Sequence, residues 1–391
     1  MSSTPTARHH LDHAATSPLR PEARAAMLDA FGAGNPNSQY AEGRAARRIL
    51  EDARESIAAD LGAEPVEVVF TSGGTEADNL GVRGLYLSGG APGTVVTTPV
   101  EHDAIRKTVD HLAAHHAAHV IEAPVDAGGR VLVDRLDDVI RATDSTQPPP
   151  HRAWTCQWAN NETGAIQPIE GFIAAADRVG APVHVDAVQA VGHLPIDFHA
   201  TGAATLAVSA HKFGGPRGIG ALLVRRDVKL TALNAGGGQE RGLRSGTPDV
   251  AAAAGMAAAL RAATTGIDAE HRRVAKLRDR LLDGLRSIDG VVVHTTEPAL
   301  PGHAHVSVPG AEGDSLIMLF DAAGVSAATG SACAAGVNRA SHVLEAMGVD
   351  VAVARGALRL TLGWSSDDAD ADAVLAVLGD TVARARAAGM A

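Results

Sequence analysis

Residues 204–226 read ATLAVSAHKFGGPRGIGALLVRR, which is two apolar runs separated by a polar, glycine-rich turn. Each run has the length of a buried strand, and Lys212 follows the first run closely. Lysine is seldom fully buried, and a desolvated lysine with a lowered pKa is a good nucleophile toward carbonyl groups. The alternative is a lysine whose long side chain reaches back to solvent. The stretch therefore predicts two core strands with a candidate nucleophile between them.

Similar apolar runs alternate with helical patterns from about residue 50 to about residue 255. The other strand candidates read VEVVFTS, GTVVTTPVE, HVIEAPV, RAWTCQWA and PVHVDAV. Continuous apolar strands separated by helices predict an α/β fold with a mainly parallel, doubly wound sheet. In such sheets ligands bind at the carboxyl ends of the strands. Cys156 lies inside one of these runs and is expected to be a buried small side chain.

The C-terminal third has a different pattern, with helices and short strands mixed. Residues 267–288, IDAEHRRVAKLRDRLLDGLRSI, have the amphipathic spacing of a surface helix. We expect a large domain over residues 15–260. Residues 1–14 and 261–391 are expected to form a smaller α+β domain.

The composition excludes several functional classes. Among 391 residues, 34 Lys and Arg face 45 Asp and Glu, and this net charge of -11 argues against nucleic-acid binding. Two cysteines do not make a disulfide framework or a C-x-x-C metal pair. No signal-peptide core and no run of about 18 apolar residues is present, so we expect a cytoplasmic protein without membrane contact. TDSTQPPP, residues 143–150, is expected to be a loop rather than a domain boundary.

The stretch TSGGTEADNL follows the strand candidate VEVVF directly. Thr75 is expected to cap the next helix, and Asp78, three residues later, completes a pattern close to a capping box. Free N–H groups at such a helix start bind anions, so Gly73, Gly74 and Thr75 form a candidate phosphate site. An ordinary strand–turn–helix link has the same sequence pattern.

Three more strand ends carry polar side chains. His102 could stack on a flat cofactor or move protons, or it could be structural. Asn161 offers an amide to a cleft, although NNETG also suits a plain turn. Asp186, with Gln189 three residues on, needs a partner if it is buried; a pyridinium nitrogen would serve, and so would a helix start. Together with Lys212 and the anion site, these groups are what pyridoxal phosphate requires.

The sequence resembles the cysteine desulfurases of the class V aminotransferase group, which are fold-type I pyridoxal-phosphate enzymes. The resemblance covers nearly the whole chain and lies in nine blocks that occur in the same order. They read LDHAATSP, TSGGTEADNL, VEHDAI, NNETGAIQPI, HVDAVQAVG, SAHKFGGPRGIG, GGGQERGLRSGTPD, TGSACAAG and LRLTLG. The resemblance implies a homodimer with pyridoxal 5'-phosphate as cofactor.

The resemblance also implies a role for each matching residue. The ring and its reaction would involve Lys212 as the covalent attachment, Asp186 at the ring nitrogen, Gln189 at the ring hydroxyl, and His102 stacked on the ring and assisting proton transfer. The phosphate would be held by Gly74, Thr75, Ser209 and His211, with Thr247 reaching the phosphate of the other subunit. Asn161 would lie near ring and substrate, and Arg359 would bind the substrate carboxylate as a bidentate guanidinium.

Cys333 lies in SAATGSACAAGVNRA, a run of small residues with little to pack, which we expect to be a mobile loop. The resemblance implies that Cys333 takes the sulfur of L-cysteine as a persulfide while L-alanine is released. It further implies a sulfur acceptor such as an iron–sulfur scaffold protein or a tRNA thiolation enzyme. Two positions depart from the family pattern: Tyr40 replaces the usual His in NPNSQYAEG, and His305 stands where Asn is frequent.

Three alternatives remain open from the sequence. The first is a selenocysteine lyase or another class V lyase, against which the TGSAC block speaks. The second is a metal-binding or scaffold protein, because His111, His115 and His119 share one helical face at i, i+4 and i+8 spacing. The third is an inactive paralogue, against which the presence of both Lys212 and Cys333 argues.

Overall fold

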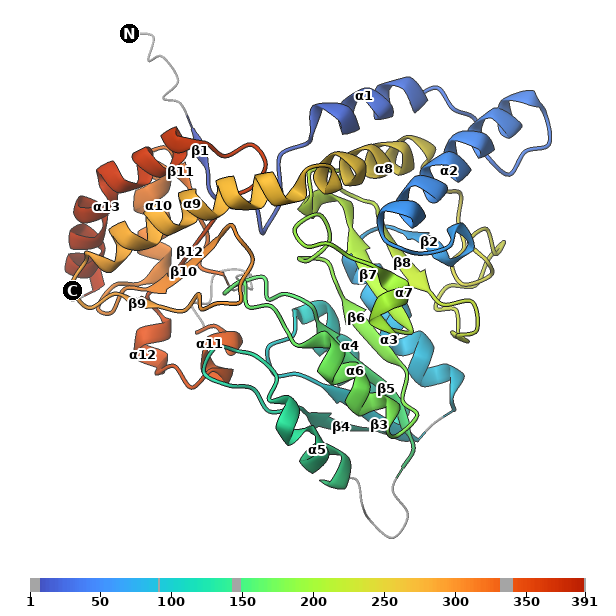
Figure 1. Ribbon diagram of the computed structural model, residues 1–391, viewed down its shortest axis with the longest axis horizontal. Coiled ribbons are helices and arrows are strands. Elements are labelled where there is room, and N and C mark those ends of the chain that lie inside the picture. The colour runs from blue at the N-terminus through green and yellow to red at the C-terminus, as the bar shows by residue number, and fades with distance from the viewer. Residues whose placement is uncertain (1–7, 91, 143–148, 331–339, 390–391) are drawn as a thin grey trace.

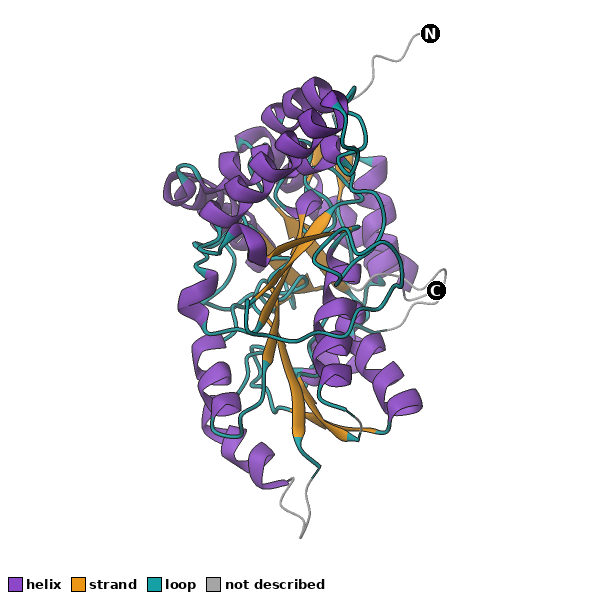
Figure 2. Cartoon of the chain, turned by 90° about the vertical axis from the view of Figure 1, so that its right-hand side faces the viewer, coloured by secondary structure: helices purple, strands orange, loops and turns teal. Residues whose placement is uncertain are grey.

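The protein is described by a computed structural model over residues 8–90, 92–142, 149–330 and 340–389. Its main feature is a seven-stranded sheet with helices on both faces (Figures 1 and 2). The strand order is β2-β8-β7-β6-β5-β3-β4. These strands are β2 (Val68–Thr71), β3 (Gly93–Thr97), β4 (Ala118–Glu122), β5 (His151–Gln157), β6 (Val183–Asp186), β7 (Thr205–Ser209) and β8 (Gly220–Val224).

The sheet is mainly parallel, as the sequence predicts. Only β8 opposes its neighbours: it is antiparallel to β2 and to β7, and the other pairings are parallel. Residues 210–219 join β7 to β8 through a short turn, and a connection of that length can link only antiparallel strands. Because β8 separates β2 from β7, these two strands run in the same direction. The carboxyl ends of β2, β3, β5, β6 and β7 therefore meet at one edge of the sheet.

Alternate side chains of the strands enter two different cores. Phe70, Val96 and Cys156 belong to the largest apolar cluster, on the face covered by α2, α6 and α8. Val69 and Val95 point the other way, toward α3 and α4. Cys156 is fully buried, which confirms its expected structural place. The helices that cover the sheet are α2 (Ala41–Asp60), α3 (Gly74–Ser88), α4 (Asp103–His116), α6 (Ile169–Asp177) and α8 (Val250–Thr264).

The C-terminal part has its own apolar core. α9 (Ile267–Arg286) confirms the predicted amphipathic helix, and its buried residues include Val274 and Leu281. They pack in one cluster with Leu11 from the N-terminal segment. The domain boundaries at residues 14 and 260 stay a prediction. The other elements of this part are β9 (Val292–Val293), β10 (His303–Ser307), β12 (Ala357–Thr361), α10 (Gly313–Ala322) and α13 (Asp368–Gly389), with β1 (His9–His10) paired in parallel to β11 (Val325–Ser326).

The remaining short helices lie around these two cores (Figure 1). They are α1 (Pro21–Ala30), α5 (Leu136–Ala142), α7 (Phe198–Thr201), α11 (His342–Ala346) and α12 (Val351–Ala354). Of the predicted loop 143–150, residues 143–148 lie outside the described residues, and residues 149–150 belong to neither helix nor strand.

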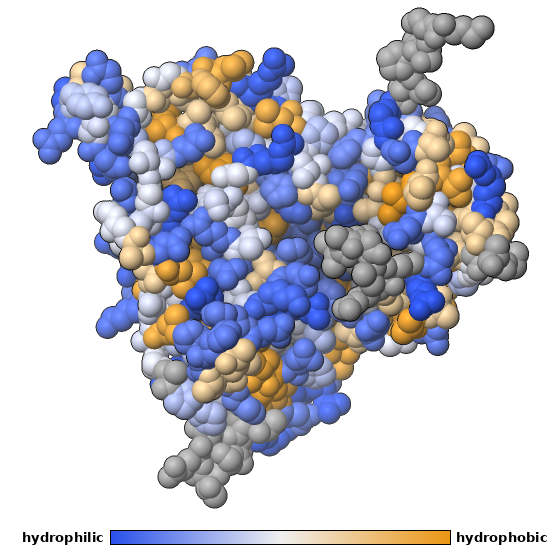
Figure 3. Space-filling model, turned by 180° about the vertical axis from the view of Figure 1, so that it is seen from behind, coloured by the Kyte–Doolittle hydropathy of each residue, from blue (hydrophilic) through white to orange (hydrophobic). Residues whose placement is uncertain are grey.

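The surface shown in Figure 3 is mainly hydrophilic, with apolar side chains in small separate groups. In the described part of the chain, no single helix is long and apolar enough to cross a membrane. α8 and α9, bent by 74° between them, pass that test of length and composition only when taken as a pair.

Candidate active site

A cavity of about 230 Å³ opens at the edge of the sheet where the five carboxyl ends meet. Its walls come from the segments that follow β2, β3, β5, β6 and β7, as expected for a doubly wound sheet. The residues that line it are Gly74, Thr75, Asp78, His102, Gln157, Ala159, Asn161, Asp186, Val188, Gln189, Ser209, His211 and Lys212. Lys212 thus lies in one cavity wall with eight other residues predicted to bind the cofactor or the substrate. These are Gly74, Thr75, His102, Asn161, Asp186, Gln189, Ser209 and His211.

Lys212 ends the short 3₁₀ turn Ala210–Lys212 after β7. Its Nζ donates hydrogen bonds to the backbone carbonyls of Ala14 (2.6 Å) and Ala15 (3.2 Å). Burial, and then the positive charge of Arg359, lower the pKa of Lys212 to about 8. An amine with this pKa is partly neutral near pH 7, which is the nucleophilic form. Lys212 is half-buried, and its amine contacts the N-terminal segment in the cavity instead of extending away into solvent; its role as a nucleophile stays a prediction.

Asp186 ends β6 beside β7, and its carboxyl group is buried. Oδ1 accepts a hydrogen bond from the backbone N–H of Val188 (2.9 Å). Burial raises the pKa of Asp186, while the nearby His102 imidazole and that N–H oppose the rise. A buried carboxylate of this kind is stabilised by any cation that enters the cavity beside it.

A second carboxyl group, Asp78, lines the same cavity and is also buried. Its Oδ1 lies 3.2 Å from Nε2 of His184, whose Nδ1 lies 2.9 Å from Thr205 Oγ1. Burial raises the pKa of Asp78 and lowers the pKa of His184 to about 3, so burial disfavours the charged form of both groups. Asp186 is then the carboxylate of this region that is best placed to carry a negative charge.

The glycines before α3 let the helix start close to the cavity. Gly73 has φ 148°, a backbone conformation that is open essentially to glycine alone. A Cβ on Gly74 would lie 2.7 Å from Val188 Cγ2 and 3.4 Å from Ser209 Cβ. α3 begins at Gly74 after the N-cap Gly73, and no side chain among the described residues caps it. The N–H groups of this turn are therefore free to bind an anion.

The predicted capping by Thr75 and Asp78 is wrong. Thr75 lies inside the first turn of α3, and Asp78 contacts His184 instead of closing a capping box. The reason is Gly73, which is the N-cap in place of Thr75, so that the helix starts one residue before Thr75.

His102 and Asn161 approach the cavity from the segments after β3 and β5. His102 is the N-cap of α4, with Nδ1 accepting a hydrogen bond from the N–H of Ala104 (3.1 Å). The backbone carbonyl of Asn161 accepts a bond from Arg359 Nη1 (2.8 Å). His102 therefore has its ring oriented by the backbone, and Asn161 connects the large sheet to the C-terminal part.

Arg359 extends from β12 toward Asn161, which lines this cavity. Its Nη2 donates to Asp12 Oδ1 (2.6 Å), and only 5% of its side chain is exposed. Nε is buried and has no hydrogen-bond partner among the described residues. The two bonds to Asp12 and Asn161 occupy one N–H on each Nη, so the guanidinium has a further N–H on each Nη that suits a carboxylate.

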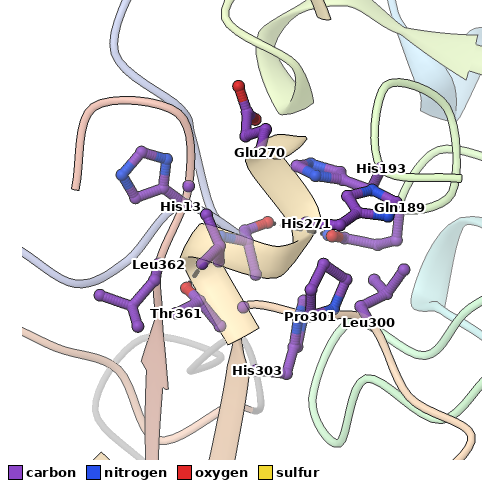
Figure 4. Close-up of a pocket in the computed structure, with 14 residues that line it drawn as sticks. His13, Gln189, His193, Glu270, His271, Leu300, Pro301, His303, Thr361 and Leu362 are labelled. Carbon is purple, nitrogen blue, oxygen red and sulfur yellow. Dashed lines mark hydrogen bonds between the residues drawn. The ribbon is translucent and has the colours of Figure 1, made fainter. Parts of the chain in front are cut away.

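A second, much smaller cavity of about 10 Å³ lies behind the first, with Gln189 in the wall of both. Figure 4 shows four histidines around it: His13, His193, His271 and His303. Burial lowers the pKa of all four, so this group of rings is neutral near pH 7. Its volume is about that of one water molecule, which is too small for a substrate.

Gln189 Nε2 donates to the carbonyl of Ala14 (2.8 Å), the same oxygen that Lys212 contacts. Thr16 Oγ1 lies 3.1 Å from His211 Nδ1. Sequence reasoning missed these contacts of residues 12–16, although LDHAATSP was among the quoted blocks. Gln157, another lining residue, was missed as well, because it lies inside an apolar run that gives no polar signal.

The residues present fit pyridoxal phosphate. A Cβ on Gly74 would crowd Val188, so the helix start needs glycine there, and the N–H groups of the first turn of α3, which no described side chain caps, suit a phosphate. The buried Asp186 suits a pyridinium nitrogen, and Lys212 presents an amine of lowered pKa to an aldehyde. The cavity therefore brings together the kinds of groups that this cofactor needs.

The chain matches the family model for class-V aminotransferases over residues 9–374. It is 49% identical over 390 residues to the IscS-like cysteine desulfurase of Mycobacterium tuberculosis, covering 98% of each chain. The chain belongs to the cysteine desulfurase family. A solved NifS-like protein superposes with a TM-score of 0.88 at 32% identity, over 96% of this chain and 100% of the other. A solved SspA in complex with cysteine has a TM-score of 0.76 at 29% identity, covering 91% and 99%.

For this cysteine desulfurase family member, the resemblance seen in the sequence and the fold-type I architecture are confirmed. The individual residue roles stay predictions. Cys333 lies outside the described residues. Thr247 is exposed and is not part of the cavity wall of its own subunit. Of the two departures from the family pattern, Tyr40 is exposed, whereas His305 is fully buried near Gly330.

The predicted histidine face is wrong. α4 ends at His116, and Ala117 follows in the left-handed conformation with φ 52°, so His119 lies on β4 instead. His111 and His115 do lie side by side, with ring centroids 4.6 Å apart and the rings tilted by 48°. Within the described ranges, no group of three or more His, Cys, Asp or Glu side chains is arranged to hold a metal ion.

Proposed function

We propose that this protein is a cysteine desulfurase that takes the sulfur of L-cysteine onto Cys333 and releases L-alanine. Pyridoxal phosphate would be bound covalently by Lys212, with its phosphate at the start of α3 and its ring nitrogen at Asp186. The observation that carries the proposal is the lysine of pKa about 8 in one cavity with a buried carboxylate and an uncapped helix N-terminus. The match to relatives named cysteine desulfurase supports the choice of reaction.

Binding of the amino acid would use groups on both sides of the cavity. Arg359 has a further N–H on each Nη and would bind the carboxylate, and Asn161 is linked to Arg359 through its own backbone. These contacts would place the amino group toward Lys212. The SspA structure that holds cysteine is a fold relative of this chain and supports cysteine as the substrate.

Proton movement would involve Lys212 and His102. Lys212 can give up or take a proton near neutral pH, because its pKa is lowered to about 8. When bound, the cofactor supplies an electron sink for the negative charge that develops at the substrate Cα. Asp186, held by the N–H of Val188, would stabilise the positive ring nitrogen on which that sink depends.

Sulfur transfer would then be a displacement at the substrate sulfur, in which the electron pair of the broken C–S bond goes to Cβ. The thiolate of Cys333 bonds to the substrate sulfur, the substrate C–S bond breaks, and Cβ receives a proton, so L-alanine and a persulfide are formed. The sequence block TGSACAAG supports Cys333 as the acceptor. The persulfide would be passed on to an iron–sulfur scaffold or a tRNA thiolation enzyme in the cytoplasm. We further propose a homodimer in which Thr247 reaches the phosphate of the other subunit.

The proposal is tested with purified protein, reconstituted with pyridoxal phosphate and then given L-cysteine. We expect cofactor absorbance, formation of alanine, and one added sulfur atom on Cys333 by mass spectrometry. Lys212→Ala is expected to lose the covalent cofactor and all turnover. Cys333→Ser is expected to keep the cofactor absorbance but to form no persulfide, whereas the matched control Cys156→Ala keeps the persulfide. Wild-type sulfide release by Cys333→Ser contradicts the proposed role of that residue.

A further inference from the structure

Arg359 is already paired with a carboxylate of the protein itself, that of Asp12. Its Nη2 donates to Asp12 Oδ1 at 2.6 Å, and its Nη1 donates to the carbonyl of Asn161 at 2.8 Å. The side chains of Arg359 and Asp12 are 5% and 21% exposed, so solvent screens this ion pair only weakly. A substrate carboxylate that reaches Arg359 therefore meets a guanidinium whose charge is already partly neutralised.

Asp12 is held next to Arg359 by the backbone on both sides. Asp12 forms a bridge with Thr361, two residues beyond Arg359 on β12. The N–H of Thr361 donates to the carbonyl of Leu11 (2.7 Å), and Thr361 Oγ1 accepts from the N–H of Ala14 (2.9 Å). These bonds hold the Asp12 backbone beside Arg359 without using its side chain, so the carboxylate is free to pair with Arg359.

The guanidinium has donors left for a second carboxylate. Of its five N–H groups, these two hydrogen bonds occupy one on each Nη, which leaves the second N–H of each Nη as a donor; the Nε–H is buried and has no partner in the described part of the chain. A substrate carboxylate can thus bind beside Asp12 instead of replacing it. Two carboxylates that share one guanidinium repel each other, and this repulsion is strong where the surroundings are poorly solvated.

We propose that Asp12 is a positioning residue of the carboxylate subsite: it fixes the Arg359 guanidinium and, as a resident anion, keeps the binding of amino-acid carboxylates weak. The functional consequence is faster release of the product, because L-alanine carries the same carboxylate as the substrate. This inference rests on the proposed function, since it takes Arg359 as the carboxylate ligand.

The decisive variant is Asp12→Asn, because asparagine keeps the shape and one oxygen acceptor for Arg359 Nη2 while it removes the negative charge. We expect L-alanine, titrated into the reconstituted protein and followed by calorimetry, to bind at least about tenfold more tightly than to wild type. The KM for L-cysteine is expected to fall by a similar factor, and kcat is expected to fall or stay level because product leaves more slowly.

Two further variants separate charge from structure. Asp12→Glu keeps the charge and is expected to hold L-alanine within about threefold of wild type. Asp370→Asn is the matched control: it removes a carboxylate that pairs with His9 (2.9 Å) of the same N-terminal segment but does not contact Arg359, and L-alanine affinity should be unchanged. Thermal unfolding and cofactor absorbance confirm that each variant is folded and loaded.

Unchanged or weaker L-alanine binding by folded Asp12→Asn overturns the inference, and so does an equal gain in Asp12→Glu. The inference can be judged apart from the proposed function, because L-alanine binding does not require sulfur transfer. If wild-type protein forms no persulfide but Asp12→Asn still tightens L-alanine binding, the proposed function fails and the role of Asp12 stands.

Discussion

Glu101 offers a sharp test of how burial controls charge in this site. Its side chain is fully buried after β3, and Oε1 accepts hydrogen bonds from Thr98 Oγ1 (2.7 Å) and from the N–H of Gln157 (3.0 Å). Burial raises the pKa of Glu101 from 4.5 to about 8, and the nearby Asp186 adds to the rise. Native protein therefore retains a proton on Glu101 that the unfolded chain releases.

The sign of the effect follows from this difference in proton binding. Between pH 4.5 and about 8 the native state holds more protons at Glu101 than the unfolded state, so stability is lost as the pH rises through this window. The glutamine of Glu101→Gln does not titrate, so the free energy of unfolding of this variant does not fall for this reason. Each unit of pKa difference corresponds to about 1.4 kcal/mol, so from about pH 6 to about pH 8 the variant gains roughly 3 kcal/mol over wild type.

The measurement is urea unfolding of cofactor-free wild type and Glu101→Gln at about pH 6 and about pH 9, after a check that unfolding is reversible. We expect the free-energy difference between the two proteins to move in favour of the variant at the higher pH. The matched control is Glu122→Gln, which makes the same change of side chain at the exposed end of β4. Equal differences at both pH values for Glu101→Gln refute the reasoning.

Two more predictions concern stability. Arg54→Met leaves the buried Glu240 without the guanidinium that contacts both of its oxygens (2.8 and 3.0 Å). We expect thermal unfolding to show that the protein loses about 3–5 kcal/mol of stability. A loss below about 1 kcal/mol contradicts this reasoning. Gly220→Ala places a Cβ 2.3 Å from the backbone oxygen of Val208, and we expect loss of about 1–3 kcal/mol or more, whereas Gly32→Ala, with nothing within 4 Å of its Cβ, should be nearly neutral. If both glycine variants unfold at the same temperature, the crowding at Gly220 does not matter.

The strands were predictable because each carries apolar side chains on both faces, a pattern that only a doubly covered sheet requires. Lys212, Asp186 and His102 were predictable for a related reason: parallel strands bring the residues after them to one edge. The exceptions have local causes. Thr75 does not cap α3 because Gly73 starts the helix earlier, and His119 misses the histidine face because Ala117 ends α4.

Contacts between distant segments gave no sequence signal of their own. Asp12 and Arg359 are separated by 347 positions, and Lys212 and the Ala14 carbonyl by 198. No periodicity or spacing rule connects residues so far apart, because their meeting depends on how the N-terminal segment joins the second core. The blocks LDHAATSP and LRLTLG identify both partners but not the bond between them.

The carbonyl of Ala14 accepts bonds from Lys212 and from Gln189, and a main-chain oxygen is present whatever side chain the position carries. Side-chain substitution does not remove such a group. A variant of residue 14 that keeps full activity would therefore give no information about the importance of its carbonyl. Replacing that one oxygen by sulfur, in a protein assembled by chemical ligation, weakens the acceptor without touching any side chain. This backbone substitution measures directly how much the Ala14 carbonyl contributes to holding the Lys212 amine in place.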